Sequence, residues 1–514
     1  MTLHVSTPKR AFRISALHSF RRASRFLLVL LSSFSLLTAH ANDVTAIASG
    51  SWNAPATWVR TLPGTINVNS GTATVTATGV TFQGLVSVDD FIHLADGTLV
   101  GKVKLVNANN TLTLYANVSG NKTGAWGKEA VPLPGDDVFI NKIFTVTVTA
   151  DATAASLSVA NGTNTSGFSL LEIGAFTLTV TGKVQVDAGS GMGRNSKIVF
   201  TGAGTLDVGG DLIVGSAGSS NSTATLDCGT LAANVKVKGN FGRTNTNGSF
   251  LPGTSSKVWF TGTAAQTINL LTNFTYADIR VANTGAVTLG AAVTSTNVKG
   301  NIEVTSGTLS TNNLNVALAS GKNISVSSGA TLDAGSSVIT LSGAGAATIN
   351  GTFKTSNVNG LFGSASTAFA ASPAISLSGS TIEYSGTGQL VMVNSIAYNN
   401  LTFSGGSKNV GTASGQTLNI GGAWVINSAA NLAVNNVIVN VSGNVSGTGA
   451  LTVGTNLITA TADWTQSGGI SGSANMKFTS AAATSIPAAT YSSLEANATK
   501  TLAGNVTATT MTLT

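Results

Sequence analysis

From residue 42 onward the chain alternates apolar and polar residues with a period of two, and no stretch keeps the 3.6-residue period of an amphipathic helix. Short runs of β-branched residues, such as 144–148 (Phe-Thr-Val-Thr-Val) and 437–441 (Val-Ile-Val-Asn-Val), are bounded by Gly, Asn and Ser. Such runs predict short strands joined by tight turns. The pattern therefore predicts an all-β fold.

A short element of the form apolar-Asp-x-Gly recurs at a regular step of about 20 residues. It occupies 186–189, 206–209 and 226–229, and it returns out of that register at 332–335. Such a period, with short strands and Gly/Asn turns, is typical of a β-solenoid, in which each turn adds strands to parallel sheets and inward Val, Leu and Ile stack. We therefore expect residues 131–514 to form a parallel β-helix with about 20 residues per turn.

A longer repeat of about two turns overlies the short one. Its three copies begin at residues 257, 381 and 475. Across them the shared unit reads Phe-x-Gly/Ser, Gln-Thr-Ile, Tyr-x-x-Leu and Lys-Thr-Leu-x-Gly-x-Val. This unit resembles the repeat of large exported β-strand-repeat proteins of Gram-negative bacteria. Those are adhesin-like or cell-surface proteins that often end in a type IX sorting domain.

The start of the predicted helix carries a second resemblance. Residues 49–58 (Ser-Gly-Ser-Trp-Asn-Ala-Pro-Ala-Thr-Trp) and 134–140 (Pro-Gly-Asp-Asp-Val-Phe-Ile) are similar to the beginning of an eight-glycine domain, which leads into a right-handed β-helix. The resemblance implies that the helix is right-handed, and it carries no catalytic residue over. In that domain the two motifs lie close together, whereas here the long segment 59–133 separates them.

The intervening residues predict a small module of their own. Asp96-Gly97 between alternating segments is a strong hairpin signal. We expect residues 63–130 to form an antiparallel β-barrel-like insertion whose four strands lie at 72–76, 88–94, 98–106 and 111–114. Residues 42–62 then form the N-terminal cap of the solenoid, where Trp52 and Trp58 cover its open end. The alternative role for these two rings is stacking against sugars.

Charge is sparse and concentrated in a leader. The 514 residues include 59 Gly and 8 Pro, and only 9% are charged, against about 25% in an ordinary soluble domain. The formal charge is +7, but residues 1–41 hold six Lys or Arg and no acid, which leaves 20 Lys and Arg against 19 Asp and Glu elsewhere. This near-neutral remainder has no basic footprint for nucleic acid.

The leader has the pattern of an export signal. A basic stretch precedes the apolar run that starts at 26–31, and Ala-His-Ala at 39–41 follows as a small-x-small cleavage signature. We expect cleavage near Ala41-Asn42 and a protein that is secreted or held on the outer cell surface. An uncleaved membrane anchor is the alternative. No later segment has the composition of a membrane span, because Gly, Ser, Thr and Asn interrupt every apolar stretch.

Few residues remain for catalysis or metal binding after the leader. His93 is the only histidine beyond residue 41 and Cys228 the only cysteine, which excludes a disulfide framework and a Cys/His metal cluster. No nucleophile elbow accompanies His93. We interpret His93 as a strand residue beside the Asp96-Gly97 turn, and Cys228 as a small buried apolar residue. The chemistry left to consider is that of carboxylates.

Asp187, Asp207 and Asp227 are the candidate site residues. At one residue per turn they would form a row of carboxylates about 5 Å apart, which suits a Ca²⁺ site or glycoside chemistry. The structural alternative is that Asp before x-Gly caps a corner by accepting backbone N–H bonds. Asp333 has the same local context away from the row, which favours the structural interpretation. No other cofactor is indicated.

These observations favour a non-catalytic, exported structural or adhesin-like β-solenoid whose partners are glycans or other surface components. The alternative is a polysaccharide-active lyase or hydrolase, or a polysaccharide-binding β-helix protein. Residue 514 falls inside a strand of the third long repeat. We therefore expect the sequence to be part of a longer protein whose further region carries sorting or anchoring signals.

Overall fold

The computed structural model describes residues 42–107, 110–215, 221–370, 373–480, 484–497 and 500–513. All of them belong to one unit, Asn42–Thr514, and the predicted signal peptide at 1–41 lies outside the described residues. The described residues form strands and one 3-10 turn, η1 (Pro55–Thr57), with no α-helix among them, so the predicted all-β class is confirmed. Within these ranges no helix could cross a membrane.

Six antiparallel strands near the N-terminus close into a barrel. Each strand pairs with two others in the ring order β3-β4-β7-β6-β5-β8 and back to β3. The strands are β3 (Trp58–Val68), β4 (Thr74–Thr78), β5 (Phe91–Leu94), β6 (Leu99–Val106), β7 (Thr111–Leu114) and β8 (Lys122–Glu129). The barrel has its own apolar core, in which Phe82 and Trp126 pack edge to face at 5.1 Å.

The expected antiparallel module is therefore present, but with six strands where four were predicted. The sequence did not reveal β3 because Pro63 and Gly64 interrupt its alternation, and the β3–β8 pairing skips these two residues. Two glycines, Gly124 and Gly127, weaken the pattern of β8 in the same way.

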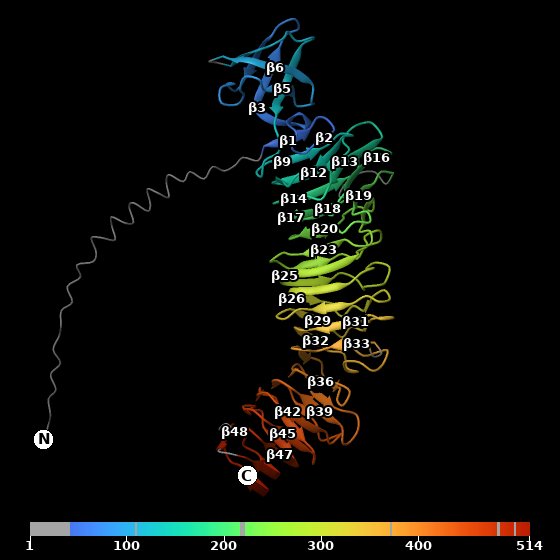
Figure 1. The fold of residues 1–514 in the computed structure, drawn as a ribbon, viewed down its shortest axis with the longest axis vertical. Helices are drawn as coiled ribbons and strands as arrows, with labels where there is room; N and C mark the ends of the chain where they lie inside the picture. Colours follow the sequence, from blue (N-terminus) through green and yellow to red (C-terminus); the bar gives the residue numbers. More distant parts are fainter. Residues whose placement is uncertain are drawn as a thin grey trace, which may run out of the picture. The chain divides into compact units, whose positions relative to one another are not determined.

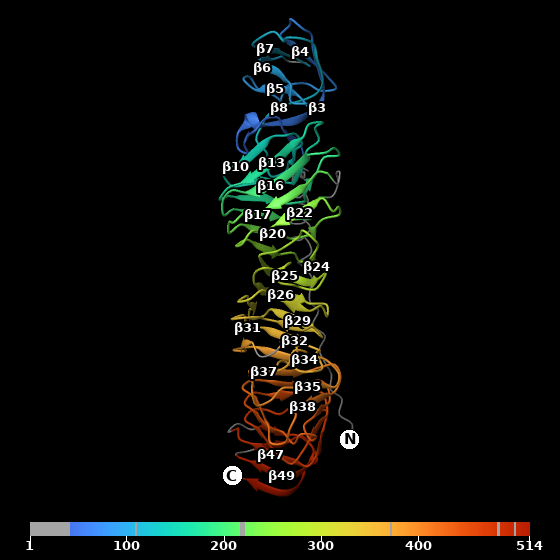
Figure 2. The same ribbon diagram turned by 90° about the vertical axis from the view of Figure 1, so that its right-hand side faces the viewer.

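The rest of the described chain forms three ladders of parallel strands (Figures 1 and 2). The first ladder starts from β1 (Asp43–Ala46), which also pairs with β3, and continues through the second halves of the long strands β25 (Asp278–Leu289) and β26 (Ile302–Ser310). Its other strands are β9 (Asp137–Ile140), β12 (Ser156–Ala160), β15 (Val184–Asp187), β18 (Leu212–Val214), β21 (Phe241–Gly242), β24 (Gln266–Ile268), β29 (Thr331–Gly335), β32 (Thr352–Thr355), β34 (Thr381–Tyr384), β37 (Asn400–Phe403), β40 (Trp424–Ile426) and β43 (Val445–Ser446).

The second ladder is divided into three stretches of paired strands. These are β2 (Gly50–Ser51), β10 (Thr145–Val148), β13 (Gly167–Ile173), β16 (Arg194–Phe200), β19 (Ala224–Asp227) and β22 (Gly248–Leu251); then β27 (Val316–Ala317) and β30 (Ile339–Thr340); then β35 (Gln389–Val391), β38 (Lys408–Val410), β41 (Ala430–Asn431), β44 (Leu451–Val453) and β46 (Ile470–Gly472).

The third ladder is interrupted once among the described residues, between β33 and β36. Before the break it contains β11 (Ala152–Ala154), β14 (Thr177–Val180), β17 (Thr205–Val208), β20 (Asn234–Val237), β23 (Lys257–Phe260), the first halves of β25 and β26, β28 (Ile324–Val326), β31 (Ala346–Ile349) and β33 (Ala374–Ser376). After it come β36 (Ala397–Tyr398), β39 (Thr417–Ile420), β42 (Ile438–Val441), β45 (Leu457–Ala460), β47 (Ala474–Phe478), β49 (Thr490–Ala496) and β51 (Thr507–Leu513). A separate pair is formed by β48 (Thr484–Ile486) and β50 (Lys500–Leu502).

The separation in sequence between paired residues varies along the chain and is shortest in the C-terminal turns. Leu178 pairs with Leu206 near the start of the stack, whereas Ile458 pairs with the much nearer Met476 toward its end. The predicted turn of about 20 residues fits the first turn, from Val138 to Leu157, but it is too short for the turns that follow, such as those from Leu157 to Val184 and from Leu178 to Leu206. The reason is that the corners there carry longer loops than the apolar-Asp-x-Gly spacing indicates.

One apolar core runs through the three ladders. Alternate residues of nearly every strand point inward and are at most a few per cent exposed, and together they form one continuous cluster from Val44 to Ala496. At its beginning Trp52 and Trp58 are fully buried and pack edge to face at 5.2 Å. Neither ring is therefore available for stacking against a sugar.

Candidate functional site

The three candidate aspartates lie on three different ladders. Asp187 belongs to β15 of the first ladder, Asp207 to β17 of the third and Asp227 to β19 of the second. The predicted row of adjacent carboxylates is wrong, because a full turn is longer here than the step between the motifs, and each motif therefore falls on another face. Among the described residues no group of three or more His, Cys, Asp or Glu side chains could hold a metal ion.

Two of the Asp-x-Gly elements do cap corners. Asp227 Oδ1 accepts the backbone N–H of Gly229 at 2.8 Å, and Asp333 Oδ1 accepts that of Gly335 at 3.1 Å. Asp227 also pairs with Lys197 at 2.7 Å. At these positions the geometry agrees with the structural interpretation of the motif.

His93 and Cys228 are both buried. His93 in β5 places Nε2 3.0 Å from Glu129 Oε1 and Nδ1 3.1 Å from the carbonyl oxygen of Gly97, and so it ties two barrel strands to a hairpin turn. Burial raises the pKa of the Cys228 thiol to about 12, which leaves it a neutral core residue at physiological pH.

The long repeat supplies side chains that satisfy buried main-chain groups at the corners. Gln266 donates to the carbonyl oxygens of Val237 and Gly239, and Gln389 donates to those of Thr355 and Asn357. The repeated tyrosines act likewise: their buried hydroxyls donate to carbonyl oxygens within their own turns, as Tyr276, Tyr398 and Tyr491 show. The repeated Gln and Tyr residues therefore stabilise the interior of the stack by satisfying its buried carbonyl oxygens.

Lys408 continues this series with a charged group. It is the register partner of Gln389, and its side chain is fully buried. Its Nζ donates to the carbonyl oxygens of Gly386, Ser404 and Gly406 at 2.5–2.6 Å. The three N–H groups of the ammonium thus match three carbonyl oxygens. Lys408 and Gln389 therefore do the same thing in successive turns, which is to donate hydrogen bonds to buried main-chain carbonyl oxygens.

A row of charges and one aromatic ring crosses the outer face of the third ladder. Asp207, Lys236, Trp259, Arg280 and Glu303 are successive register partners. The Arg280 guanidinium lies 4.2 Å from the centre of the Trp259 ring and Lys236 Nζ lies 5.9 Å from it. Because cations lie against this ring and acids end the row, its charges are compensated within the row.

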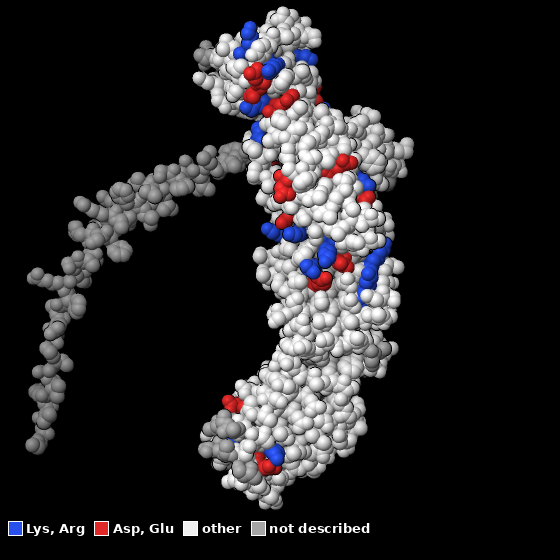
Figure 3. All heavy atoms as spheres, viewed as in Figure 1, with Lys and Arg blue, Asp and Glu red and all other residues white. Residues whose placement is uncertain are grey.

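The sequence does not reveal this row, because its members follow one another at unequal intervals along the chain. Figure 3 shows charged atoms gathered over the barrel and the turns that follow it, and an almost uncharged surface over the later strands.

The barrel presents a second outward cluster, the Phe91–Lys102–Tyr115 platform. Phe91 and Lys102 are cross-strand partners in β5 and β6, and Tyr115 follows β7. Both rings are exposed, and Lys102 Nζ lies 5.8 Å and 5.4 Å from their centres. The same ammonium pairs with Asp89 at 2.7 Å. Exposed rings beside a donor and an acceptor are suited to a hydroxylated ligand.

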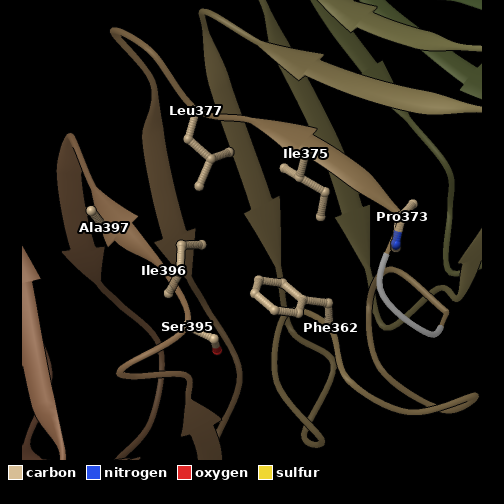
Figure 4. Close-up of a pocket in the computed structure, with 7 residues that line it drawn as sticks. All are labelled: Phe362, Pro373, Ile375, Leu377, Ser395, Ile396 and Ala397. Atoms are coloured by element: carbon tan, nitrogen blue, oxygen red, sulfur yellow. The ribbon is translucent and has the colours of Figure 1, made fainter.

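The third candidate feature is a groove in the surface of the stack. A groove of about 310 Å³ lies at the break between β33 and β36 and is lined by Phe362, Pro373, Ile375, Leu377, Ser395, Ile396 and Ala397. In Figure 4 the Phe362 ring lies between the strand that carries Ile375 and the segment that carries Ser395 and Ile396. All the lining side chains except that of Ser395 are apolar, and polar main-chain atoms are exposed beside them, so the groove is suited to a ligand that has both apolar and hydrogen-bonding groups.

No protein-family model matches this chain, and a search among curated proteins finds no similar sequence.

Proposed function

We propose that the protein is an exported, non-catalytic structural or adhesin-like element of a bacterial cell surface, built as a right-handed parallel β-helix with a barrel at its start. The observation that carries the proposal is the use of the repeated side chains. Gln266, Gln389 and Lys408 all satisfy carbonyl oxygens inside the stack. When the repeated residues stabilise contacts between successive turns, each added repeat lengthens the stack and continues its core.

The outer surface supports the same role. Outward positions of the strands are mostly Thr, Ser and Asn, and only seven charged residues follow residue 334: Lys354, Glu383, Lys408, Asp463, Lys477, Glu495 and Lys500. A neutral surface rich in hydroxyl and amide groups suits weak, repeated contacts with glycans or other surface components. The resemblance to exported β-strand-repeat proteins favours the same class.

Export is supported by the basic and apolar leader. N-terminal sequencing of protein recovered from the outside of producing cells should begin at Asn42. Recovery of the intact leader from membranes would instead support the uncleaved anchor.

The test of the main proposal compares attachment with catalysis. Cells that lack the protein should attach less well to the surfaces they colonise, and attachment should return on complementation with the Asp207→Ala variant. Purified protein should release no reducing ends or unsaturated sugars from a panel of polysaccharides. If the parent protein depolymerises a polysaccharide and the folded Asp207→Ala variant does not, the proposal is wrong and a lyase or hydrolase is favoured.

A second candidate function is polysaccharide binding, and the platform of Phe91, Lys102 and Tyr115 favours it. Glycan-array binding followed by calorimetry should show affinity that Tyr115→Ala lowers by about tenfold, as expected for loss of one stacking ring. Phe168→Ala is the matched control, because this ring is similarly exposed but lies in β13 of the stack. Equal effects of the two variants contradict a site on the barrel.

A further inference from the structure

The break in the third ladder leaves two strand edges on either side of an apolar groove. Among the described strands, β33 pairs only with β31 and β36 pairs only with β39. Every other strand inside this ladder has a partner on both sides. A strand with one partner keeps unpaired N–H and C=O groups along its other edge, and such an edge can accept an added strand.

The core is open to solvent at the same place. Ile375 is the register partner of Ala347, which is 1% exposed, yet Ile375 itself is only half-buried. Ile396 precedes the inward-facing Tyr398 by two residues and therefore lies on the same side of the chain, and it too is half-buried. Two inward positions thus lack the cover that a neighbouring strand provides elsewhere in the ladder.

The lining defines the chemistry of an occupant. No charged side chain lines the groove among the described residues, and Ser395 is its one hydroxyl group. β33 has three residues, which at about 3.3 Å per residue gives an edge of roughly 10 Å. The neighbouring strand of the same ladder, Thr417–Ile420, is likewise short, uncharged and apolar at alternate positions. A segment of that kind matches the groove in length, charge and pattern.

We infer that the groove between β33 and β36 is a peptide-binding site. It takes a short, extended, uncharged segment as an additional strand of the third ladder. Alternate apolar side chains of that segment face Phe362, Ile375 and Ile396, and its main chain bonds to the free edges. The apolar lining explains affinity for the side chains, and the edges explain why an extended peptide is preferred to a compact apolar molecule.

The first experiment measures binding of a labelled peptide to the purified protein by fluorescence anisotropy. The probe copies residues 414–422 (Ser-Gly-Gln-Thr-Leu-Asn-Ile-Gly-Gly), which include the third-ladder strand one turn further along. It should bind saturably. N-methylation of two adjacent central residues should weaken binding by about tenfold or more, because one N–H is lost toward each edge. Equal affinity of the methylated peptide, or no saturable binding of the parent, overturns the inference.

The second experiment locates the site with matched variants on one strand. Ile375→Lys should abolish binding, whereas Ser376→Lys, on the outward side of the same strand, should leave the affinity unchanged. If Ile375→Lys prevents folding, Phe362→Ser replaces it as the test variant, because Phe362 lines the groove but does not belong to a strand. If Phe362→Ser and Ile375→Lys both retain the affinity of the parent protein, the peptide binds elsewhere and the inference is wrong.

Discussion

The most unusual residue of the stack is Lys408, a charge buried among carbonyl oxygens. Replacing it with Met keeps the volume but leaves three acceptors without donors, each at a cost of about 1–3 kcal/mol. We expect Lys408→Met to lower the free energy of unfolding by about 3 kcal/mol or more in urea titrations. Lys408→Gln should lose less, because Gln389 makes equivalent bonds one turn earlier.

Lys477→Met is the control for that measurement. Lys477 pairs with Glu495 on the surface, where such pairs contribute less than about 1 kcal/mol. If Lys408→Met costs no more than Lys477→Met, the buried ammonium contributes nothing to the corner, and its carbonyl oxygens must be satisfied in another way.

The same lysine predicts a pH dependence. Burial lowers the pKa of Lys408 to about 8 from 10.5, against a smaller opposing effect of Glu383. Between these values the unfolded chain binds more protons than the folded one, so the contribution of Lys408 to stability rises with pH in this window. The free energy of unfolding of the parent relative to Lys408→Gln should increase by up to about 1.4 kcal/mol per pH unit between pH 8 and 10.

Urea titrations of both proteins from pH 6 to 10 test this slope. The difference should be flat below about pH 7, where Lys408 is charged in both states. A difference that stays flat up to pH 10 means that the folded protein keeps the ordinary pKa of a lysine.

Single residues could be predicted from the sequence where the cause is local. The corner-capping role expected of an Asp two residues before a Gly is present at Asp227 and Asp333. In the same motif at 187–189 and 207–209, the N–H groups of Gly189 and Gly209 instead donate to main-chain carbonyl oxygens. The predicted row through Asp187 and Asp207 failed, because the faces on which they lie depend on the full length of a turn. That length is set by corner loops whose sequences carry no period.

At the scale of elements, close backbone approach between turns restricts particular glycines. Gly307 in β26 has φ +70°, and a Cβ there would lie 1.6 Å from the carbonyl oxygen of Asn283 in the preceding turn. Gly321 has nearly the same φ, +74°, but open space around it. Gly321→Ala should cost about 1–2 kcal/mol for the left-handed conformation alone, and Gly307→Ala should cost at least about 2 kcal/mol more.

Thermal and urea unfolding of these two variants separate conformational strain from steric contact. Equal losses in the two proteins would mean that the turns can move apart at Gly307 without cost, which contradicts a tightly held register between β25 and β26.

Strands were predictable where alternation is clean. The run at 437–441 contains β42, and the run at 144–148 contains β10. The order of ladders was not predictable, because the separation in sequence between pairing partners changes along the chain, as the pairings of β32 with β34 and of β49 with β51 show. The groove between β33 and β36 could not be predicted either, because the alternation of apolar and polar residues in a strand does not depend on whether the strand has one partner or two.

At the scale of the whole described unit, barrel and stack have separate apolar cores that meet at a few named contacts. Arg60 in β3 pairs with the buried Asp136 at 2.5 Å and donates to the carbonyl oxygen of Val131 at 3.0 Å. β3 also continues the antiparallel pairing with β1. The residues that join barrel and stack therefore lie at the ends of β3 and β8 and in the Asp96-Gly97 turn, where Lys142 Nζ donates to the carbonyl oxygen of Asp96.

This arrangement predicts that the barrel can be removed without loss of the stack. Arg60 and Lys128 are register partners, so a Gly-Ser-Gly linker can replace residues 61–127 and keep the Arg60–Asp136 pair. Because the two cores are separate, calorimetry of the parent should show two transitions, and the shortened protein should keep the stack transition within about 5 °C. A fall much larger than this, with loss of the strand signal in circular dichroism, would show that the stack depends on the barrel as its cap.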